Sequence, residues 1–92
     1  MTIKVEFRGP LESQGVQTTY HVDIRNQKRV RDVLDQLLQQ NDVLEEIFSD
    51  MRTVEQNTMV LLNEKDVTLF DGLDTKLEDG DNLLVLPLVH GG

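Results

Sequence analysis

The sequence predicts a single α+β domain in which one sheet is covered by one main helix, with the element order β-β-α-β-β. Three observations support this order. Apolar residues alternate with period two near the N-terminus, recur with a helical period in the middle, and form two short runs separated by turn signals in the C-terminal half. The length of 92 residues is enough for one hydrophobic core and too short for two. We assign the domain to residues 1–88.

Two N-terminal strands are predicted by the alternation of apolar and polar side chains. Ile3, Val5 and Phe7 alternate with charged residues. Residues 16–24 show the same pattern and are rich in residues that favour strands. Residues 9–15 begin with Gly-Pro and end with Gly, which is typical of a connecting loop. The two strands are therefore expected to form a hairpin.

The main helix is predicted where the apolar period changes. One apolar stripe consists of Val30, Val33, Leu34, Leu37 and Leu38. Asn26 is predicted to lie in the N-cap region, and Asn41 to end the helix. A shorter helical piece is expected around residues 44–48. Residues 49–58 are polar without a clear period, and they are predicted to form a loop.

Two apolar runs predict the C-terminal strands. The first is Met59–Leu62, followed by a turn over residues 63–66, and the second is Leu83–Leu86, preceded by the turn sequence Asp79-Gly80-Asp81. Because the second run is apolar on both faces, it is expected to be an interior strand. Pro87 has no N–H group and is predicted to end the strand ladder.

Composition and charge limit the classes of partner. The formal net charge is −8, which argues against nucleic acid or an anionic membrane as the main partner, because both require a basic face. An acidic domain instead favours a basic protein partner. The chain has no cysteine and no apolar run near the ~20 residues that span a bilayer. These features predict a cytoplasmic protein.

No set of side chains is predicted to perform catalysis or to bind a metal. The two imidazoles, His21 and His90, have no ligand partners at a suitable spacing. The acidic residues before Gly72 and Gly80 do not follow the spacing of a calcium-binding loop. We therefore expect a protein that is not an enzyme and that holds no cofactor of its own.

The C-terminal residues 89–92 are predicted to form a free tail ending in Gly91-Gly92. Four extended residues reach about 13 Å beyond the fold. Because glycine has no Cβ, such a tail can enter a slot that is too narrow for other residues. Its terminal carboxylate is ionised at neutral pH and is an unhindered nucleophile toward the α-phosphate of ATP.

These C-terminal residues carry a resemblance to a known family. The segment Leu73–Asp81, the run Leu84–Pro87 and the closing Gly91-Gly92 are similar to the C-terminal half of MoaD-type ubiquitin-like proteins. MoaD is the small, sulfur-carrying subunit of molybdopterin synthase. ThiS, the ubiquitin-related modifier and the small archaeal modifier proteins are its relatives. The resemblance is strong over residues 59–92 and rests on element order over residues 1–58.

The resemblance implies a β-grasp fold and a carrier that a second protein activates. An E1-like enzyme of the MoeB/ThiF type would adenylate Gly92 with ATP and magnesium, and Gly91 and His90 would thread its slot. The product would be a thiocarboxylate for a molybdopterin synthase large subunit or a tRNA thiolase, or an isopeptide bond to a target lysine. Leu88 and His90 differ from the residues usual in MoaD, and the His-Gly-Gly ending resembles the ubiquitin-related modifier.

A docking surface for the partner is predicted near the last strand. Alternation places Leu84, Leu86 and Leu88 on one face, with Pro87 at the strand end, while Leu83 and Val85 point to the other face. One set must cover the core, and the other is then left for a partner that is apolar at its centre and basic at its rim. The alternative function is a β-grasp module that only binds partners non-covalently.

Overall fold

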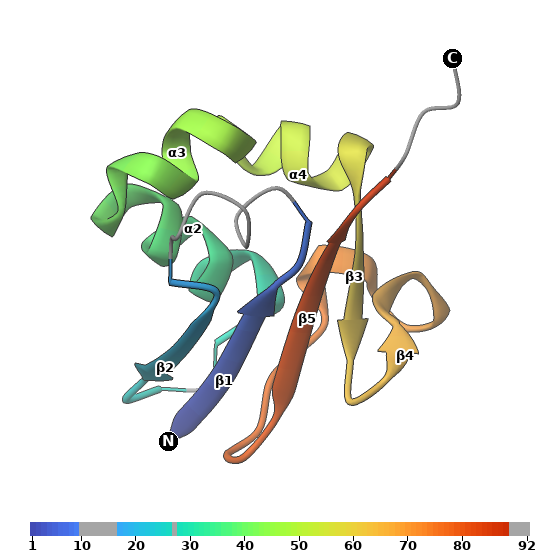
Figure 1. The fold of residues 1–92 in the computed structure, drawn as a ribbon. Coiled ribbons are helices and arrows are strands. Elements are labelled where there is room, and N and C mark those ends of the chain that lie inside the picture. The colour runs from blue at the N-terminus through green and yellow to red at the C-terminus, as the bar shows by residue number, and fades with distance from the viewer. Residues whose placement is uncertain (10–16, 27, 89–92) are drawn as a thin grey trace.

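The computed structural model describes residues 1–9, 17–26 and 28–88, which form one α+β domain (Figure 1). The strands in this part of the chain are β1 (Thr2–Phe7), β2 (Thr19–Asp23), β3 (Thr58–Leu62), β4 (Lys65–Asp66) and β5 (Asn82–Pro87). The α-helices in it are α2 (Val30–Gln40), α3 (Asp42–Phe48) and α4 (Met51–Asn57), and two short 3-10 turns cover Val67–Leu69 and Gly72–Asp74.

The five strands form one mixed sheet in the order β2-β1-β5-β3-β4. The predicted hairpin is confirmed, because β1 and β2 pair in antiparallel fashion with Val5 opposite Tyr20. The last strand lies in the middle of the sheet, parallel to β1 and antiparallel to β3. The apolar run at the C-terminus is therefore an interior strand, as predicted.

The core lies between α2 and one face of the sheet. The predicted apolar stripe of α2 is confirmed, because all five of its residues are buried. They form one apolar cluster with the inward residues of the strands, among them Val5, Val60 and Val85. The Phe7 ring adds an edge-to-face contact with Tyr20, at 5.9 Å between ring centres. Figure 1 shows α2 behind the sheet, with α3 and α4 across the top of the view.

The N-terminal cap of α2 differs from the prediction. The cap is Arg29, whose N–H donates to the carboxylate of Asp32 at 2.9 Å, and Asn26 lies outside the helix with an exposed side chain. The Arg29 guanidinium also donates to the carbonyl of Asp74, so the helix start is tied to the segment before β5. Propensity favours Asn as a cap, but this tertiary contact places the helix start three residues later.

Asn41 has two roles, and we expect its loss to destabilise the fold. It ends α2 as predicted, and its side-chain oxygen also accepts from the N–H groups of Val43 and Leu44 at the start of α3. Its amide donates to the hydroxyl of Tyr20. Asn41→Ala should lower the free energy of unfolding by about 1–2 kcal/mol. Urea denaturation measures this change.

Asn26→Ala is the matched control, because it removes the same side chain at the position that sequence reasoning favoured as a cap. It should change the free energy of unfolding by less than about 0.5 kcal/mol. Equal destabilisation by the two substitutions would contradict the assignment of the cap.

The segment predicted as a loop over residues 49–58 contains a helix. Helix α4 begins after Asp50, whose carboxylate accepts from the N–H of Thr53 at 2.9 Å. That bond lowers the pKa of the Asp50 carboxyl. Val54 alone is buried in α4, while Met51 packs partly against the core. Two turns with one buried residue are too short to show an apolar period.

Two strand boundaries also differ from the prediction. The turn expected over residues 63–66 is tighter, because Asn63 and Glu64 alone form it with positive φ angles of 49° and 72°. Lys65 and Asp66 then return as β4 beside Leu62 and Leu61. Strand β2 begins at Thr19, so it is shorter than the predicted 16–24.

Residues 10–16, which include most of the predicted loop over residues 9–15, lie outside the described residues. No helix within the described ranges is both long enough and apolar enough to cross a membrane.

Candidate functional site

The base of the predicted tail is held in the sheet up to Leu88. Pro87 is the last residue of β5 and pairs with Thr58. The next N–H group, from Leu88, donates to the carbonyl of Asn57 at 2.9 Å. The predicted site residues His90, Gly91 and Gly92, and the predicted free tail over residues 89–92, lie outside the described residues.

The predicted division of β5 into two faces agrees with the structure. Leu83 and Val85 are buried in the core, while Leu84 and Leu86 are half-buried on the opposite face and Leu88 is 41% exposed. On that open face Leu84 lies between Glu6 of β1 and Leu61 of β3, and Leu86 lies beside Met59.

Met59 and Leu61 were not among the predicted docking residues. They extend the exposed side of β5 into an apolar strip, which consists of Met59, Leu61, Leu84, Leu86 and Leu88. The signal that could have found them is the alternation within residues 59–62, because the antiparallel register with β5 places every second residue on the same face.

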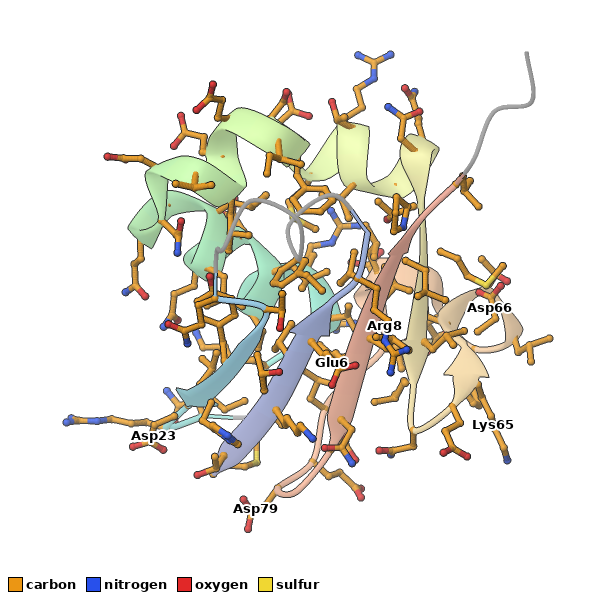
Figure 2. The ribbon with its side chains drawn as sticks, viewed as in Figure 1. Glu6, Arg8, Asp23, Lys65, Asp66 and Asp79 are labelled. Carbon is orange, nitrogen blue, oxygen red and sulfur yellow. The ribbon has the colours of Figure 1, made fainter. Side chains whose placement is uncertain are left out.

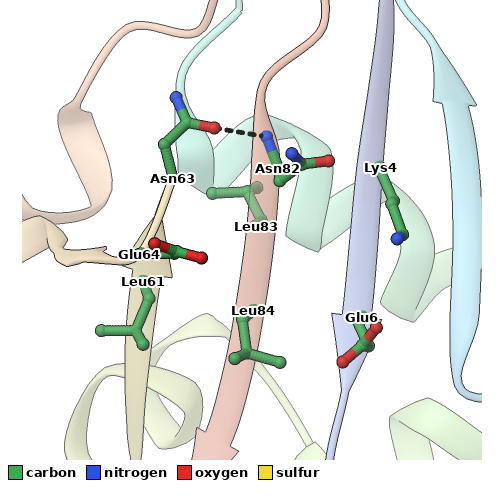
Figure 3. Close-up of a pocket in the computed structure, with 8 residues that line it drawn as sticks. All are labelled: Lys4, Glu6, Leu61, Asn63, Glu64, Asn82, Leu83 and Leu84. Carbon is green, nitrogen blue, oxygen red and sulfur yellow. Dashed lines mark hydrogen bonds between the residues drawn. The ribbon is translucent and has the colours of Figure 1, made fainter.

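A depression of about 440 Å³ lies on the open face at one end of the apolar strip (Figure 3). Its lining consists of Lys4, Glu6, Leu61, Asn63, Glu64, Asn82, Leu83 and Leu84. Two hydrogen bonds, each 2.9 Å long, hold the Asn63 side chain at one end of the depression. Its oxygen accepts from the N–H of Asn82, and its amide donates to the carboxylate of Asp81. The depression therefore combines leucine side chains with charged ones, because Glu6 is the neighbour of Leu84 across the sheet and Glu64 lies beside Leu61 (Figure 3).

A second hollow, of about 200 Å³, lies at the other end of the apolar strip, beside Leu88. Its walls are mainly apolar and include Met59 and Leu73, and among the residues that the structure describes Glu55 and Asp66 are the charged ones that line it. The N–H and hydroxyl of Thr68 donate to the Asp66 carboxylate and hold its pKa below the usual value. The rim of this hollow is therefore negatively charged at neutral pH.

The charges beside the apolar strip are partly neutralised on the β1 side. Arg8 and Glu6 form an ion pair at 2.9 Å, and Figure 2 shows their side chains next to each other on the open face. Glu64 and Glu55 are exposed acidic groups on the β3 side. The strip is thus bordered by acidic side chains at its β3 border, on the side away from β5, and by Lys4 together with the Glu6–Arg8 pair at its β1 border.

His21 lies on β2 with an exposed side chain, as its position in the alternation predicted. Among the described residues, no group of three or more His, Cys, Asp or Glu side chains is arranged to hold a metal ion.

Comparison with known proteins places this architecture in a family. The chain matches the ThiS family over residues 12–92. Ubiquitin-related modifier 1 of Gallus gallus is 34% identical over 98 aligned residues, which cover all of this chain and 96% of that protein. A homolog of the same modifier from Dictyostelium discoideum is 30% identical over 96 residues, covering both proteins completely.

Solved structures support the same fold. The crystal structure of SAMP1 from Haloferax volcanii has a TM-score of 0.78 at 24% identity, covering both chains completely. A complex of subunits 1 and 2 of the molybdopterin-converting factor from Helicobacter pylori contains a chain with a TM-score of 0.65 at 25% identity, again with complete coverage of both chains. The β-grasp fold implied by the resemblance is confirmed.

The resemblance to MoaD- and ThiS-type proteins is also confirmed, and it extends beyond the C-terminal half. The family match begins at residue 12, whereas within residues 1–58 the resemblance rested on element order alone. Relatives in this group are modifiers and carriers rather than catalysts, in agreement with the prediction that this protein is not an enzyme. The chain therefore belongs to the ThiS family of ubiquitin-like sulfur carriers and modifiers.

Proposed function

We propose that the protein works through the carboxylate of Gly92, which an E1-like enzyme of the MoeB/ThiF type activates with ATP and magnesium. The observation that carries the proposal is the position of β5. This interior strand ends at Pro87, and the sequence then continues through Leu88 to the diglycine. The open face of the same strand forms part of the exposed apolar strip. Membership of the ThiS family supports this assignment.

The proposed reaction has two steps. A carboxylate oxygen of Gly92 attacks the α-phosphorus of ATP, and pyrophosphate leaves to give an acyl-adenylate. A sulfide equivalent or the amine of a target lysine then attacks the carbonyl carbon, and AMP leaves. The first nucleophile gives a thiocarboxylate for tRNA thiolation or molybdopterin synthesis, and the second gives an isopeptide bond.

The apolar strip is the proposed docking surface for the activating enzyme and for the sulfur-accepting protein. A partner seated on Leu84, Leu86 and Leu88 would lie next to the base of the tail. The Helicobacter pylori structure, in which a similar chain is in complex with a second subunit, supports a protein partner of this kind. Acidic groups at the β3 border favour basic side chains at the partner's rim.

Association with the activating enzyme should weaken as salt is added. Raising the ionic strength from about 0.05 M to about 0.5 M should increase the Kd roughly ten-fold, because the acidic border is exposed and screened by ions. Calorimetry at several salt concentrations measures the slope of log Kd against the logarithm of the salt concentration. Glu64→Gln should reduce the slope, and Glu46→Gln on α3 should not. Binding that does not depend on salt would contradict an acidic border at the interface.

Mass spectrometry of the protein isolated from its source cells tests the covalent function. An oxygen replaced by sulfur at Gly92 would support the sulfur carrier, and Gly-Gly remnants on lysines of other proteins would support the modifier. An unmodified Gly92, together with no ATP–pyrophosphate exchange in the presence of the activating enzyme, would favour the non-covalent interaction module. The same spectra establish whether the mature chain ends at Gly92.

A further inference from the structure

The end of β5 is held from two sides by groups that belong to other elements. On the β1 side, the N–H of Arg8 donates to the carbonyl of Val85 at 3.0 Å. On the β3 side, the N–H of Leu88 donates to the carbonyl of Asn57, where α4 passes directly into β3. Pro87 lies between these two bonds and has no N–H group to donate.

Gly9 lies opposite the Pro87 ring, and its missing side chain leaves room for that ring. A Cβ added to Gly9 would lie 2.6 Å from Cγ and 3.2 Å from Cδ of the Pro87 ring. A Cβ atom essentially never lies as close as 2.6 Å to a heavy atom of a residue that is not its neighbour in the chain. Gly9 also has a φ of +106°, which glycine adopts more easily than other residues. The pyrrolidine ring is therefore in contact with the backbone of the residue that follows Arg8.

This contact constrains the position of the end of β5. The Pro87 ring is fused to the main chain and cannot turn away from a new side chain as a flexible one could. A side chain at position 9 must therefore displace the backbone at Gly9, at Pro87 or at both. Where Pro87 moves, Leu88 shifts relative to the carbonyl of Asn57, to which its N–H donates.

We infer that Gly9 is a positioning residue for the reaction at Gly92: its contact with Pro87 and the Leu88–Asn57 hydrogen bond fix the position of Leu88, from which the sequence continues to the diglycine, relative to the apolar strip. The inference rests on the proposed function. A partner docked on Leu84 and Leu86 then meets the tail base at a set angle, and a small displacement of a reacting group can lower its rate strongly.

Gly9→Ala tests the contact, and Gly80→Ala is the matched control. Gly80 also has a positive φ, of +87°, but a Cβ there would meet no heavy atom within 4 Å. With the activating enzyme and ATP, Gly9→Ala should lower the maximal rate of ATP–pyrophosphate exchange about ten-fold, with less than a two-fold change in the Kd. Gly80→Ala should leave both values within about two-fold of the wild type.

A double substitution separates positioning from general damage. Pro87→Ala removes Cγ and Cδ of the ring. Adding Gly9→Ala to Pro87→Ala should therefore lower the maximal exchange rate by less than about two-fold relative to Pro87→Ala alone. Amide hydrogen exchange of Leu88 in the free protein gives a readout that needs no partner. It should be faster in Gly9→Ala and unchanged in Gly80→Ala.

The outcomes distinguish the inference from the proposed function. If wild-type protein supports no exchange, the proposed function fails, and the Leu88 amide decides whether Gly9 holds the tail base. The inference is wrong if Gly9→Ala matches the wild type both in the maximal exchange rate and in the hydrogen exchange of the Leu88 amide. It is also wrong if Gly9→Ala lowers the exchange rate as much in the Pro87→Ala background as in the wild type. Should Gly9→Ala not fold, a lower maximal rate in Pro87→Ala at unchanged melting temperature supports the inference, and an unchanged rate overturns it.

Discussion

Gly91→Val should abolish activation of the carboxylate while leaving binding to the activating enzyme intact. A β-branched side chain widens the tail and restricts its backbone, so the carboxylate of Gly92 no longer reaches the α-phosphate of ATP. Misplacement of a reacting group by about 1 Å can cost about 100-fold, and we expect at least that loss in ATP–pyrophosphate exchange. The Kd should stay within about two-fold, because the apolar strip is unchanged.

His90→Ala is the control for Gly91→Val, because it changes the neighbouring position without adding a branch. We interpret His90 as a spacer, and its substitution should alter exchange by less than about three-fold. Exchange by Gly91→Val at the wild-type rate would mean that the diglycine serves only as a flexible end. The covalent function would then lose its main physical support.

The strands and the main helix were predictable because each has a repeating pattern that is long enough to recognise. Five apolar positions at helical spacing identify α2, and both apolar runs of the C-terminal half became strands. The end of β5 at Pro87 was also predictable from the missing N–H group, although the N–H of Leu88 still donates to the carbonyl of Asn57. The two faces of β5 followed from alternation as soon as the strand was recognised as interior.

The missed features depend on contacts between distant residues. Helix α4 has one buried residue, so its presence is decided by the Asp50 cap and by packing of Val54 rather than by a period. The start of α2 is set by the bond from Arg29 to Asp74, which is 45 residues away. The contact of Gly9 with Pro87 joins the two ends of the chain, and no local pattern could have indicated it.

The apolar strip could be predicted only in part for the same reason. The residues of β5 were found from their own alternation, but Met59 and Leu61 join them through the register of β3 with β5. That register is fixed at one end by two hydrogen bonds between Asn63 and Asn82, in which the N–H of Asn63 donates to the carbonyl of Asn82 and the side-chain oxygen of Asn63 accepts from the N–H of Asn82. These are properties of the folded sheet.

Leu86→Asp should remove most of the affinity for the activating enzyme. Leu86 lies near the centre of the apolar strip, opposite Met59, and a carboxylate there would be buried against an apolar partner surface without a counter-charge. Truncation of a central interface residue costs about 2 kcal/mol or more, which corresponds to a Kd increased at least about 30-fold. Calorimetry or surface plasmon resonance measures this change.

His21→Asp is the control, because it adds the same carboxylate to an exposed position of the same sheet, on β2 and away from the strip. Its Kd should stay within about three-fold of the wild type. Leu88→Asp tests the strip at its exposed end, where a charge perturbs the fold least because that side chain is 41% exposed. Normal binding by both Leu86→Asp and Leu88→Asp, with melting temperatures close to the wild type, would place the docking surface elsewhere on the domain.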